Sequence, residues 1–459
     1  MMREPAFSLL HRPAPSLLKG KRVLVLGLGD TGLSVARWVE REGGKARVAD
    51  TRASPPRKKD FSGELHTGAF APALLDDVDL LCISPGLPLR DPVVQTAIER
   101  RIPVVGDIEL FAWHVHNNGA CRIAAVTGTN GKSTVTSLTG HLLRAAGFDC
   151  EVAGNISPPA LEALLKREIP PAVWVLELSS YQLETTWSLD PDAAAMLNIT
   201  EDHLDRYGSL DEYAAAKARV FGRGTQVLNR DDPRSMALAR ADRRRTTFGL
   251  GMPSSDEDFG ILLLDGERWL AQGRNLILEV SALPIHGLHN AANALAACAL
   301  ARALGAPYEA LAAGLRSWRP LPHRMERIAV RRGVEWFDDS KGTNVGATVA
   351  ALRGLARSTV LIAGGEGKGQ DFSPLAEPAR ELVSCALLIG RDAPLIESAL
   401  AGVRVERCAS LEAAVKTAAA IAQPGEAVLL SPACASFDMF RDYRHRGEVF
   451  AAAVRKLPA

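Results

Sequence analysis

Residues 127–134 combine glycines, hydroxyl side chains and one lysine in a segment suited to binding phosphate. They read Thr-Gly-Thr-Asn-Gly-Lys-Ser-Thr, after the apolar stretch 123–126 and before the helix-like stretch 132–146. Backbone N–H groups of such a turn bind phosphate oxygens, and the lysine adds a charge for the outermost ones. Val126 stands where the standard P-loop has its first glycine. We expect a nucleoside triphosphate here, and the alternative is an ordinary strand-to-helix turn with a surface lysine.

A second glycine-rich turn has the spacing found in dinucleotide-binding proteins. Gly27, Gly29 and Gly32 follow the apolar stretch 22–26, and Asp50 ends the next apolar stretch. This pattern places a pyrophosphate at a helix N-terminus and a sugar hydroxyl beside the acid. It fits NAD(P), a UDP-sugar or a tight turn without a ligand, and taken alone it favours a nicotinamide oxidoreductase.

Glu177 suggests metal binding, whereas two further side chains, His203 and Lys217, have ordinary structural explanations. Glu177 lies in the apolar run 173–178, where a carboxylate needs a partner such as Mg²⁺, unless it is exposed at the strand end. His203 lies among acids that could equally be solvated, and a lone histidine is more often structural than a ligand. Lys217 has the setting of a lysine on an exposed helix face. The residues themselves therefore support Glu177 more strongly than the other two.

Polar residues in the second half of the chain are open to two interpretations. Asn290 and Asn293 are three apart, so they lie on one side of a predicted helix as nucleotide ligands or as helix-start residues. Arg324, Asp339 and Lys341 follow at a domain junction and after a strand. Surface ions are the commonest role of such charged residues.

The composition limits the class of protein. With 459 residues and 47% hydrophobic content, the chain can form two or three domains with packed cores. Its 54 basic and 53 acidic residues give a net charge of +1, which argues against nucleic-acid or membrane-surface binding. Seven scattered cysteines without a C-x-x-C pair indicate reduced thiols in the cytoplasm. No apolar run approaches the ~18–20 residues of a membrane span.

Short apolar runs alternate with helical patterns almost throughout, which predicts an α/β protein with parallel sheets. We expect a terminal extension at residues 1–20 and three units in series, covering residues 1–106, 107–320 and 321–459. The main predicted strands are 22–26, 46–49, 80–83, 123–126, 173–178, 334–337, 359–363, 386–389 and 427–430, and the main predicted helices are 33–41, 132–146 and 290–304.

The order of these motifs resembles the Mur ligase family from about residue 20 to the end of the chain. The similar segments include the phosphate loop, Leu-Glu-Leu-Ser-Ser at residues 176–180, Asn-Ile-Thr-Glu-Asp-His-Leu-Asp-Arg-Tyr at 198–207 and Ser-Pro-Ala-Cys-Ala-Ser at 431–436. The resemblance implies a Rossmann-like N-terminal domain, a P-loop-type ATPase domain with a mostly parallel sheet, and a Rossmann-like C-terminal domain. It also implies an ATP-dependent ligase of peptidoglycan precursor synthesis.

Residues 431–436, together with Asp50-Thr51-Arg52 and Ser84-Pro85-Gly86, are similar to the corresponding segments of one branch of the family. That branch adds D-glutamate to UDP-N-acetylmuramoyl-L-alanine through an acyl phosphate. Tyr443 stands where that branch can have phenylalanine, and Gly342 where it can have alanine. The alternatives are a Mur ligase adding another amino acid or L-glutamate, a folylpolyglutamate synthetase-like ligase and, outside the class, the nicotinamide oxidoreductase.

The resemblance also implies roles for individual residues. The expected catalytic residues are Lys132, Glu177, His203 and Lys217. The expected ATP-binding residues are Gly128, Thr129, Asn130, Gly131, Lys132, Ser133, Thr134, Asn290, Asn293, Arg324, Asp339 and Lys341. The expected residues for the UDP substrate are Asp30, Thr31, Asp50, Thr51, Arg52, Ser84, Asn155 and His203, and those for the amino acid are Thr343, Lys368, Ser436, Phe437 and Tyr443.

The cofactors implied by the resemblance are ATP, two Mg²⁺ ions, and CO₂ bound as a carbamate of Lys217. Ser133 and Glu177 would serve the first metal, and His203 and carbamylated Lys217 the second. A carbamate suits magnesium because it turns a cation into an anionic oxygen ligand. We expect a cytoplasmic monomer that acts on small molecules and binds neither nucleic acid nor membrane.

Overall fold

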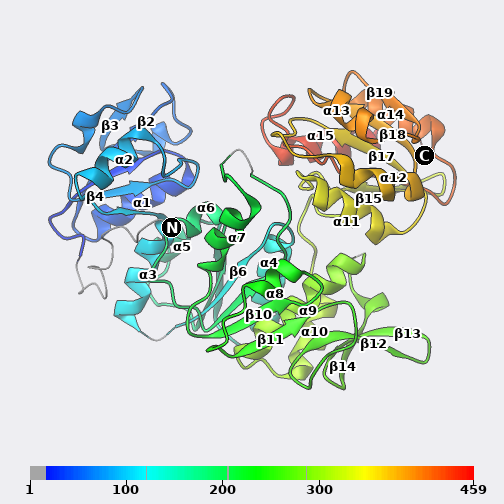
Figure 1. The fold of residues 1–459 in the computed structure, drawn as a ribbon, viewed down its shortest axis with the longest axis horizontal. Helices are drawn as coiled ribbons and strands as arrows, with labels where there is room; N and C mark the ends of the chain where they lie inside the picture. Colours follow the sequence, from blue (N-terminus) through cyan, green and yellow to red (C-terminus); the bar gives the residue numbers. More distant parts are fainter. Residues whose placement is uncertain (1–16, 120, 204–205, 286, 459) are drawn as a thin grey trace.

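The computed structural model describes residues 17–119, 121–203, 206–285 and 287–458, so most of the expected terminal extension lies outside the described residues. Three α/β domains follow one another along the chain, each built on one sheet (Figure 1). The expected fold class is confirmed. The exact domain boundaries at residues 107 and 321 stay predictions.

The first sheet has five parallel strands in the order β3-β2-β1-β4-β5. They are β1 (Arg22–Leu26), β2 (Lys45–Asp50), β3 (Glu64–Thr67), β4 (Leu80–Ile83) and β5 (Val104–Val105), with helices α1 (Asp30–Arg41) and α2 (Pro92–Glu99) between them. The helix expected from residue 33 begins at Asp30, because Gly29 is extended and ends the preceding turn. Since β2, β1 and β4 are neighbours, the residues that follow them meet at one edge of the sheet.

The central sheet has nine strands in the order β14-β13-β12-β11-β10-β9-β6-β8-β7, parallel except where β12, β13 and β14 form an antiparallel meander. The strands are β6 (Arg122–Thr127), β7 (Cys150–Gly154), β8 (Val173–Glu177), β9 (Ala193–Met196), β10 (Thr225–Asn229), β11 (Arg245–Phe248), β12 (Phe259–Leu264), β13 (Glu267–Gln272) and β14 (Asn275–Glu279). In register, Val126 pairs with Glu177, so β8 delivers its carboxylate beside the end of β6.

Helices cover the central sheet and connect its strands. They are α3 (Asp107–Asn118), α4 (Lys132–Ala145), α5 (Ala160–Leu165), α6 (Ser180–Leu183), α7 (Leu210–Ala218), α8 (Pro233–Ala237), α9 (Leu288–Ala303) and α10 (Tyr308–Ser317). α4 packs against α9 and α10, and its buried Leu138 and Leu142 share a core with Ala294 and Leu295 of α9. This packing brings the N-termini of α4 and α9 together at one end of the sheet.

The third sheet has the order β15-β16-β20-β17-β18-β19, with only the β15–β16 pair antiparallel. The strands are β15 (Glu326–Arg331), β16 (Val334–Asp338), β17 (Thr359–Gly364), β18 (Val383–Ile389), β19 (Val405–Arg407) and β20 (Ala427–Leu430). The helices are α11 (Val345–Leu355), α12 (Ala376–Leu382), α13 (Ala393–Ala399), α14 (Leu411–Ile421) and α15 (Tyr443–Arg455). We did not expect β15, whose half-exposed residues lack the apolar run of a buried strand.

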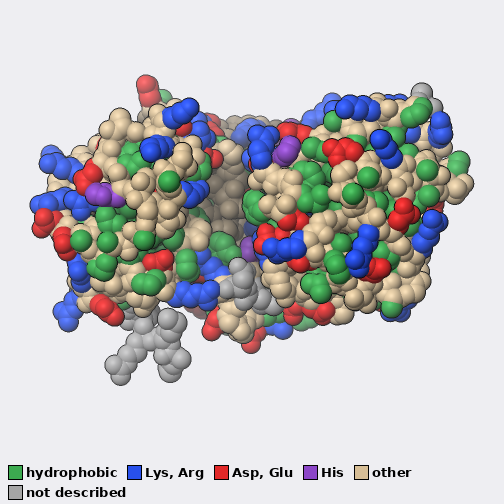
Figure 2. Space-filling view, turned by 90° about the horizontal axis from the view of Figure 1, so that it is seen from above, with side chains coloured by type: hydrophobic (Ala, Val, Ile, Leu, Met, Phe, Trp, Pro, Cys, Tyr) green, Lys and Arg blue, Asp and Glu red, His purple; other side chains and the backbone are tan. Residues whose placement is uncertain are grey.

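The first and third domains stand on the same side of the central domain (Figure 1). From above, a hollow separates the two, and lysine and arginine side chains lie along its rim (Figure 2). None of the described helices is long and apolar enough to span a bilayer.

Candidate active site

The phosphate loop connects the end of β6 to the start of α4 and depends on two glycines. Gly128 and Gly131 have φ values of 147° and 85°, which L side chains rarely adopt. A Cβ on Gly131 would also lie 2.4 Å from Oδ1 of Asn293. Asn198 fixes the loop: its Oδ1 accepts from the Asn130 amide at 2.8 Å, and its Nδ2 donates to the Asn130 carbonyl at 3.1 Å. The loop is thus preformed, with Ser133 and Thr134 in the buried first turn of α4.

Two lysines donate to the same backbone oxygen of this loop. Nζ of Lys132 lies 2.8 Å from the Gly128 carbonyl and 2.7 Å from that of Thr129, and Nζ of Lys217 lies 2.9 Å from the Gly128 carbonyl. Lys217 is only 1% exposed, so the exposed-lysine alternative is wrong. Burial lowers the pKa of Lys217 well below its ordinary value, and the charge of Lys132 lowers it further. Burial also lowers the pKa of Lys132.

Glu177 is 2% exposed at the end of β8, so the solvent-exposed alternative is wrong for it as well. Its Oε1 accepts from Nδ2 of Asn155 at 2.7 Å. Its Oε2 is buried and has no hydrogen-bond partner among the described residues. A buried carboxylate oxygen without a partner costs free energy, and a bound cation would remove that cost. The donor set beside the phosphate loop therefore fits a divalent metal ion.

His203 stands where groups from the central and third domains approach one another. Its ring centroid lies 4.8 Å from that of Tyr181, and its Nε2 lies 3.7 Å from Oδ2 of Asp202. Burial lowers the pKa of His203, and Asp202 opposes this effect. The charges of Lys368, which belongs to the third domain, and of Lys132 and Lys217 lower the pKa further. The neutral imidazole is therefore favoured, as binding to a metal requires.

A cavity of about 330 Å³ lies between the phosphate loop and the third domain. Eight of the expected ATP-binding residues line it, namely Asn130, Gly131, Thr134, Asn290, Asn293, Arg324, Asp339 and Lys341. Asn293 donates to Oδ1 of Asn290 at 3.1 Å. Gly287 is the N-cap of α9, so neither asparagine caps this helix, although Asn290 lies in its first turn. Phe248 and Leu250 add an apolar wall, which suits a planar base.

The third domain contributes an acid and a lysine with shifted pKa values to this cavity. Burial raises the pKa of Asp339 to about 7, although Oγ of Ser431 donates to its Oδ2 at 2.8 Å. Burial, together with the charge of Arg324, lowers the pKa of Lys341 to about 8. Nζ of Lys341 lies 4.2 Å from the Tyr443 ring centroid. The Tyr443 ring therefore makes a cation–π contact with the Lys341 ammonium.

The first domain gathers its expected residues at the carboxyl edge of its sheet, after β1, β2 and β4. Asp50 is 2% exposed, and both of its oxygens are engaged, by the Leu28 amide at 2.7 Å and by the Arg52 guanidinium at 2.8 and 2.6 Å. Burial raises the pKa of Asp50, but these hydrogen bonds outweigh it and bring it to about 2. Asp30 pairs with Arg57 at 2.5 Å. Asp50 thus orients Arg52 by binding its Nε and Nη2, while the Arg52 side chain remains half exposed.

Comparisons with known proteins follow the same three-domain division. Residues 21–106 match the Mur ligase MurD-like N-terminal domain, residues 126–301 the Mur ligase middle domain, and residues 323–434 the Mur ligase glutamate ligase domain. The UDP-N-acetylmuramoylalanine--D-glutamate ligase of Nitrosospira multiformis is 53% identical, covering 96% of this chain and 97% of that protein. The chain belongs to the Mur ligase family.

Other Mur ligases agree with this assignment. The UDP-N-acetylmuramoylalanine--D-glutamate ligase of Aromatoleum aromaticum is 51% identical, covering 96% of this chain and 99% of that protein. Among solved structures, MurF from Acinetobacter baumannii has a TM-score of 0.63 at 17% identity, covering 97% of this chain and 92% of that chain. The UDP-N-acetylmuramate-alanine ligase of Thermotoga maritima has a TM-score of 0.59 at 18% identity, covering 95% of this chain and 99% of that chain. These two structures show the shared fold.

The expected amino-acid residues of this Mur ligase lie around the carboxyl ends of β16, β17 and β20. Thr343 follows β16 and Lys368 follows β17, whereas Ser436, buried, and Phe437, 67% exposed, follow β20. Tyr443 begins α15. The structure thus brings these residues to one edge of the third sheet, while their role stays a prediction.

Sequence reasoning missed several residues that hold the Mur ligase site together. Arg446 is fully buried and donates to Oγ and the carbonyl of Ser340 and to the carbonyls of Cys434 and Ala435. An arginine in an amphipathic helix gives no signal of such burial. Asn198 was part of a recognised segment, but only the fold shows that it clamps the phosphate loop. Other missed residues lining the cavity are Asn229, Asp231, Phe248, Leu250 and His289.

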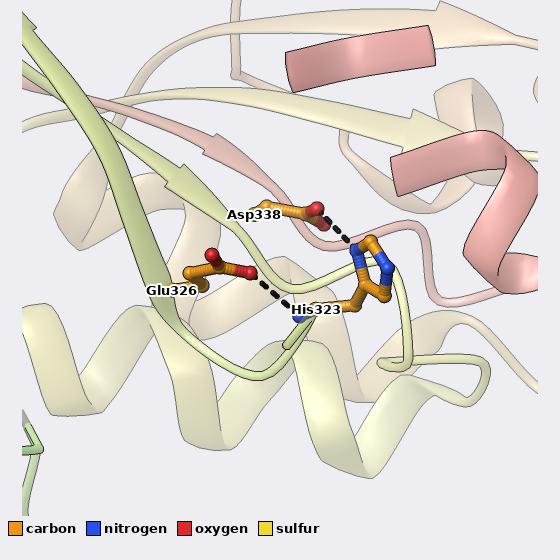
Figure 3. A group of neighbouring side chains, drawn as sticks. All are labelled: His323, Glu326 and Asp338. Atoms are coloured by element: carbon orange, nitrogen blue, oxygen red, sulfur yellow. Dashed lines mark hydrogen bonds and ion pairs between the residues drawn. The ribbon is translucent and has the colours of Figure 1, made fainter. Parts of the chain in front are cut away.

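His323, Glu326 and Asp338 form the one His/Cys/Asp/Glu group with metal-ligand spacing in the described part of this Mur ligase (Figure 3). Nδ1 of His323 lies 2.7 Å from Oδ2 of Asp338, and the His323 amide donates to Oε2 of Glu326 at 2.9 Å. The hydrogen bond to Asp338 raises the pKa of His323. We interpret the group as an ion pair that fixes the segment leading to Arg324.

Proposed function

We propose that this Mur ligase adds D-glutamate to UDP-N-acetylmuramoyl-L-alanine, with ATP as the phosphoryl donor, in cytoplasmic peptidoglycan precursor synthesis. The observation that carries the proposal is the 53% identity, over nearly the full length of both chains, to a protein named for this activity. The geometry supports it, because the phosphate loop and charged residues of the third domain line one cavity, and the buried carboxylate oxygen of Glu177 that lacks a partner lies beside the strand leading into that loop.

ATP occupies the cavity between the central and third domains in this proposal. Asn290 and Asn293 hold the adenine nucleotide beside the apolar wall, and residues 128–134 bind the phosphates. Lys132 exchanges its loop carbonyls for phosphate oxygens, since a buried ammonium group is stabilised more by an anion than by two dipoles. Arg324, Asp339 and Lys341 approach the same nucleotide from the third domain.

The metal-binding residues of the proposal are Ser133 and Glu177 for one Mg²⁺, and His203 and Lys217 for the other. When bound, the ions neutralise charge that develops on the transferred phosphoryl group. Lys217 takes part as a carbamate, because an ammonium group would repel a cation. Its lowered pKa supports this assignment, since only the neutral amine has a lone pair with which to attack CO₂.

The uridine diphosphate binds at the edge of the first domain. Asp30, Thr31, Thr51, Arg52 and Ser84 contact it, while Asp50 acts by orienting Arg52. An Asp50 whose oxygens are both engaged is poorly placed to bind a nicotinamide dinucleotide's ribose, so the oxidoreductase alternative loses its main support. Asn155 and His203 hold the rest of the substrate.

Two reaction steps follow from this arrangement. The L-alanyl carboxylate attacks the γ-phosphorus of ATP, so that an acyl phosphate forms and ADP leaves. The amine of D-glutamate, held by Thr343, Lys368, Ser436, Phe437 and Tyr443, then attacks the acyl carbon, and inorganic phosphate leaves. Domains of residues 1–106, 107–320 and 321–459 thus serve the UDP substrate, ATP and the amino acid. The enzyme acts as a monomer on small molecules alone.

The decisive experiment measures phosphate release with ATP, Mg²⁺ and UDP-N-acetylmuramoyl-L-alanine. D-Glutamate, L-glutamate, L-alanine and diaminopimelate are compared as the second substrate, and only D-glutamate should support rapid turnover. Turnover with L-alanine or diaminopimelate alone would show that the proposed specificity is wrong. Oxidation of NAD(P)H, followed by absorbance, would instead support the oxidoreductase.

A further inference from the structure

Arg206 connects the first domain to the central domain through hydrogen bonds from Nε, Nη1 and Nη2 of its guanidinium. Nη1 donates to the Pro85 carbonyl at 3.1 Å, and Nη2 donates to the Leu87 carbonyl at 3.0 Å. On the central-domain side, Nε and Nη2 donate to the two carboxylate oxygens of Glu184 at 3.1 and 2.6 Å. The side chains of Arg206 and Glu184 are only 9% and 13% exposed. A buried, bidentate and charge-assisted pair is directional, unlike a surface ion pair.

The loop that Arg206 holds is the one that follows β4 and carries Ser84. The Leu87 amide donates to the Ser84 carbonyl at 3.0 Å, so the carbonyls of Pro85 and Leu87 belong to one tight turn. Oγ of Ser84 donates to the Gly27 carbonyl at 3.3 Å. A Cβ on Gly27 would lie 2.7 Å from Oγ of Ser84, so the Ser84 turn packs directly on the glycine-rich turn that follows β1. Holding this turn therefore also holds the edge where the uridine diphosphate is proposed to bind.

Arg206 is also connected to His203, through the Tyr181 ring and through its own backbone amide. The guanidinium lies 4.2 Å from the Tyr181 ring centroid, and the Tyr181 ring lies 4.8 Å from that of His203. The Arg206 amide donates to the His203 carbonyl at 2.9 Å. The Arg206 side chain thus binds the Ser84 turn and contacts the His203 ring through Tyr181, while the Arg206 backbone amide bonds the His203 carbonyl.

We propose that Arg206 is a positioning residue that keeps the Ser84 turn of the first domain in register with His203 of the central domain. This inference rests on the proposed function, because the register matters only if one substrate spans both domains. Its consequence is that Arg206 sets where the L-alanyl carboxylate lies relative to the γ-phosphate. Since a displacement of about 1 Å can cost about 100-fold in rate, a residue remote from the reacting atoms can control the reaction.

Steady-state kinetics of Arg206→Gln and Arg206→Lys test the proposal. Arg206→Gln should raise the KM for UDP-N-acetylmuramoyl-L-alanine about tenfold and lower kcat/KM for it about 100-fold. The KM for ATP should change by less than about twofold, because Arg206 does not line the nucleotide cavity. Arg206→Lys should lie between, since a lysine keeps the charge but lacks the planar guanidinium that binds both oxygens of Glu184 while also reaching the two carbonyls.

Arg41→Gln is the matched control. Arg41 also joins the first and central domains, by donating to the Leu164 carbonyl at 3.2 Å, but far along the chain from the Ser84 turn. It should leave the KM for the UDP substrate near its wild-type value. The proposal would be overturned if Arg41→Gln raised the KM for the UDP substrate as much as Arg206→Gln does. It would also be overturned if Arg206→Gln raised the KM for ATP as much as the KM for the UDP substrate. Either result would indicate a general loss of structure rather than a specific role of Arg206.

Hydrogen exchange provides a second measurement that does not depend on turnover. The amides of Ser84, Gly86 and Leu87 should exchange faster in Arg206→Lys and Arg206→Gln than in the wild type, whereas Arg41→Gln should not change them. Unchanged exchange in the Arg206 variants would overturn the proposal. If the wild type releases no phosphate with the UDP substrate, the proposed function fails, while the exchange result still decides whether Arg206 holds the turn.

Discussion

The side chains of Asn130 and Asn344 exchange two hydrogen bonds across the boundary between the central and third domains. Nδ2 of Asn130 lies 3.2 Å from Oδ1 of Asn344, and Nδ2 of Asn344 lies 3.0 Å from Oδ1 of Asn130. Nδ2 of Asn344 also donates to Asp202 at 3.2 Å, and its Oδ1 caps α11 through the Ala347 amide at 2.9 Å. The phosphate loop is thus in direct contact with the domain that is proposed to bind the amino acid.

Asn344→Asp should weaken this contact and leave the helix cap intact. Aspartate caps helices as well as asparagine, but it cannot donate to Asn130 or Asp202 and would face the Asp202 carboxylate. Two hydrogen bonds of about 1 kcal/mol each correspond to a rise of about 10-fold to 30-fold in the KM for ATP. Ser410→Asp, at the cap of α14, is the control and should leave that KM unchanged. An unaltered KM in Asn344→Asp would show that the contact does not assist ATP binding.

Gly131→Ala should disrupt nucleotide binding, because it adds a steric contact in the phosphate loop to the backbone strain that alanine causes at this φ. Gly131 and Gly147 share a φ of 85°, where alanine costs about 1–2 kcal/mol. Only at Gly131 would the new Cβ meet another group, Oδ1 of Asn293 at 2.4 Å, whereas Gly147 has nothing within 4 Å. We expect both variants to melt at lower temperature, and only Gly131→Ala to lose ATP affinity, measured by calorimetric titration. Equal ATP affinities would contradict this assignment.

Glu177→Gln should reduce magnesium-dependent turnover about 100-fold or more without destabilising the protein. An amide removes the anionic oxygen that lacks a partner in the described structure, and it leaves a carbonyl oxygen for Asn155. Magnesium titrations of phosphate release, compared with those of the variant Glu168→Gln at an exposed position, measure the effect. Chelation of the metal should abolish turnover of the wild type. A Glu177→Gln enzyme with a wild-type magnesium response would exclude Glu177 as a ligand.

Lys217→Ala should be inactive alone and partly active when a short-chain carboxylic acid and bicarbonate are added. The cavity left by the buried side chain can admit a small carboxylate in the position of the proposed carbamate. Phosphate release with and without the acid is the measurement, and Lys166→Ala, whose side chain is 65% exposed, is the control. Full turnover of Lys217→Ala without additives would refute the carbamate.

Asp339→Asn should change how stability depends on pH. The pKa of Asp339 is raised from 3.8 to about 7, so the folded protein binds more protons than the unfolded chain between these values. Its free energy of unfolding therefore falls as pH rises from about 4 to 7, by up to about 1.4 kcal/mol per pH unit from this group. The asparagine variant should lack this part of the decline and be more stable than the wild type at pH 8. Parallel denaturant-unfolding profiles from pH 4 to 8 would contradict this.

The sequence by itself determined the local elements, the phosphate loop and the family. β1, β20 and the start of α4 were predicted to the residue, because apolar runs and glycine turns act over short stretches of chain. The carboxyl ends of neighbouring parallel strands also meet by necessity, so the residues after β1, β2 and β4 could be grouped in advance.

Only the tertiary structure decided which polar side chains are buried and what they contact. Lys217 and Arg446 have the pattern of surface residues, yet they lie 1% and 0% exposed because loops distant in sequence supply backbone carbonyls. Arg206 and Pro85 are 121 residues apart, and Asn130 and Asn344 are 214 apart. Such partners depend on how the three domains pack, and no periodicity within one segment encodes that packing.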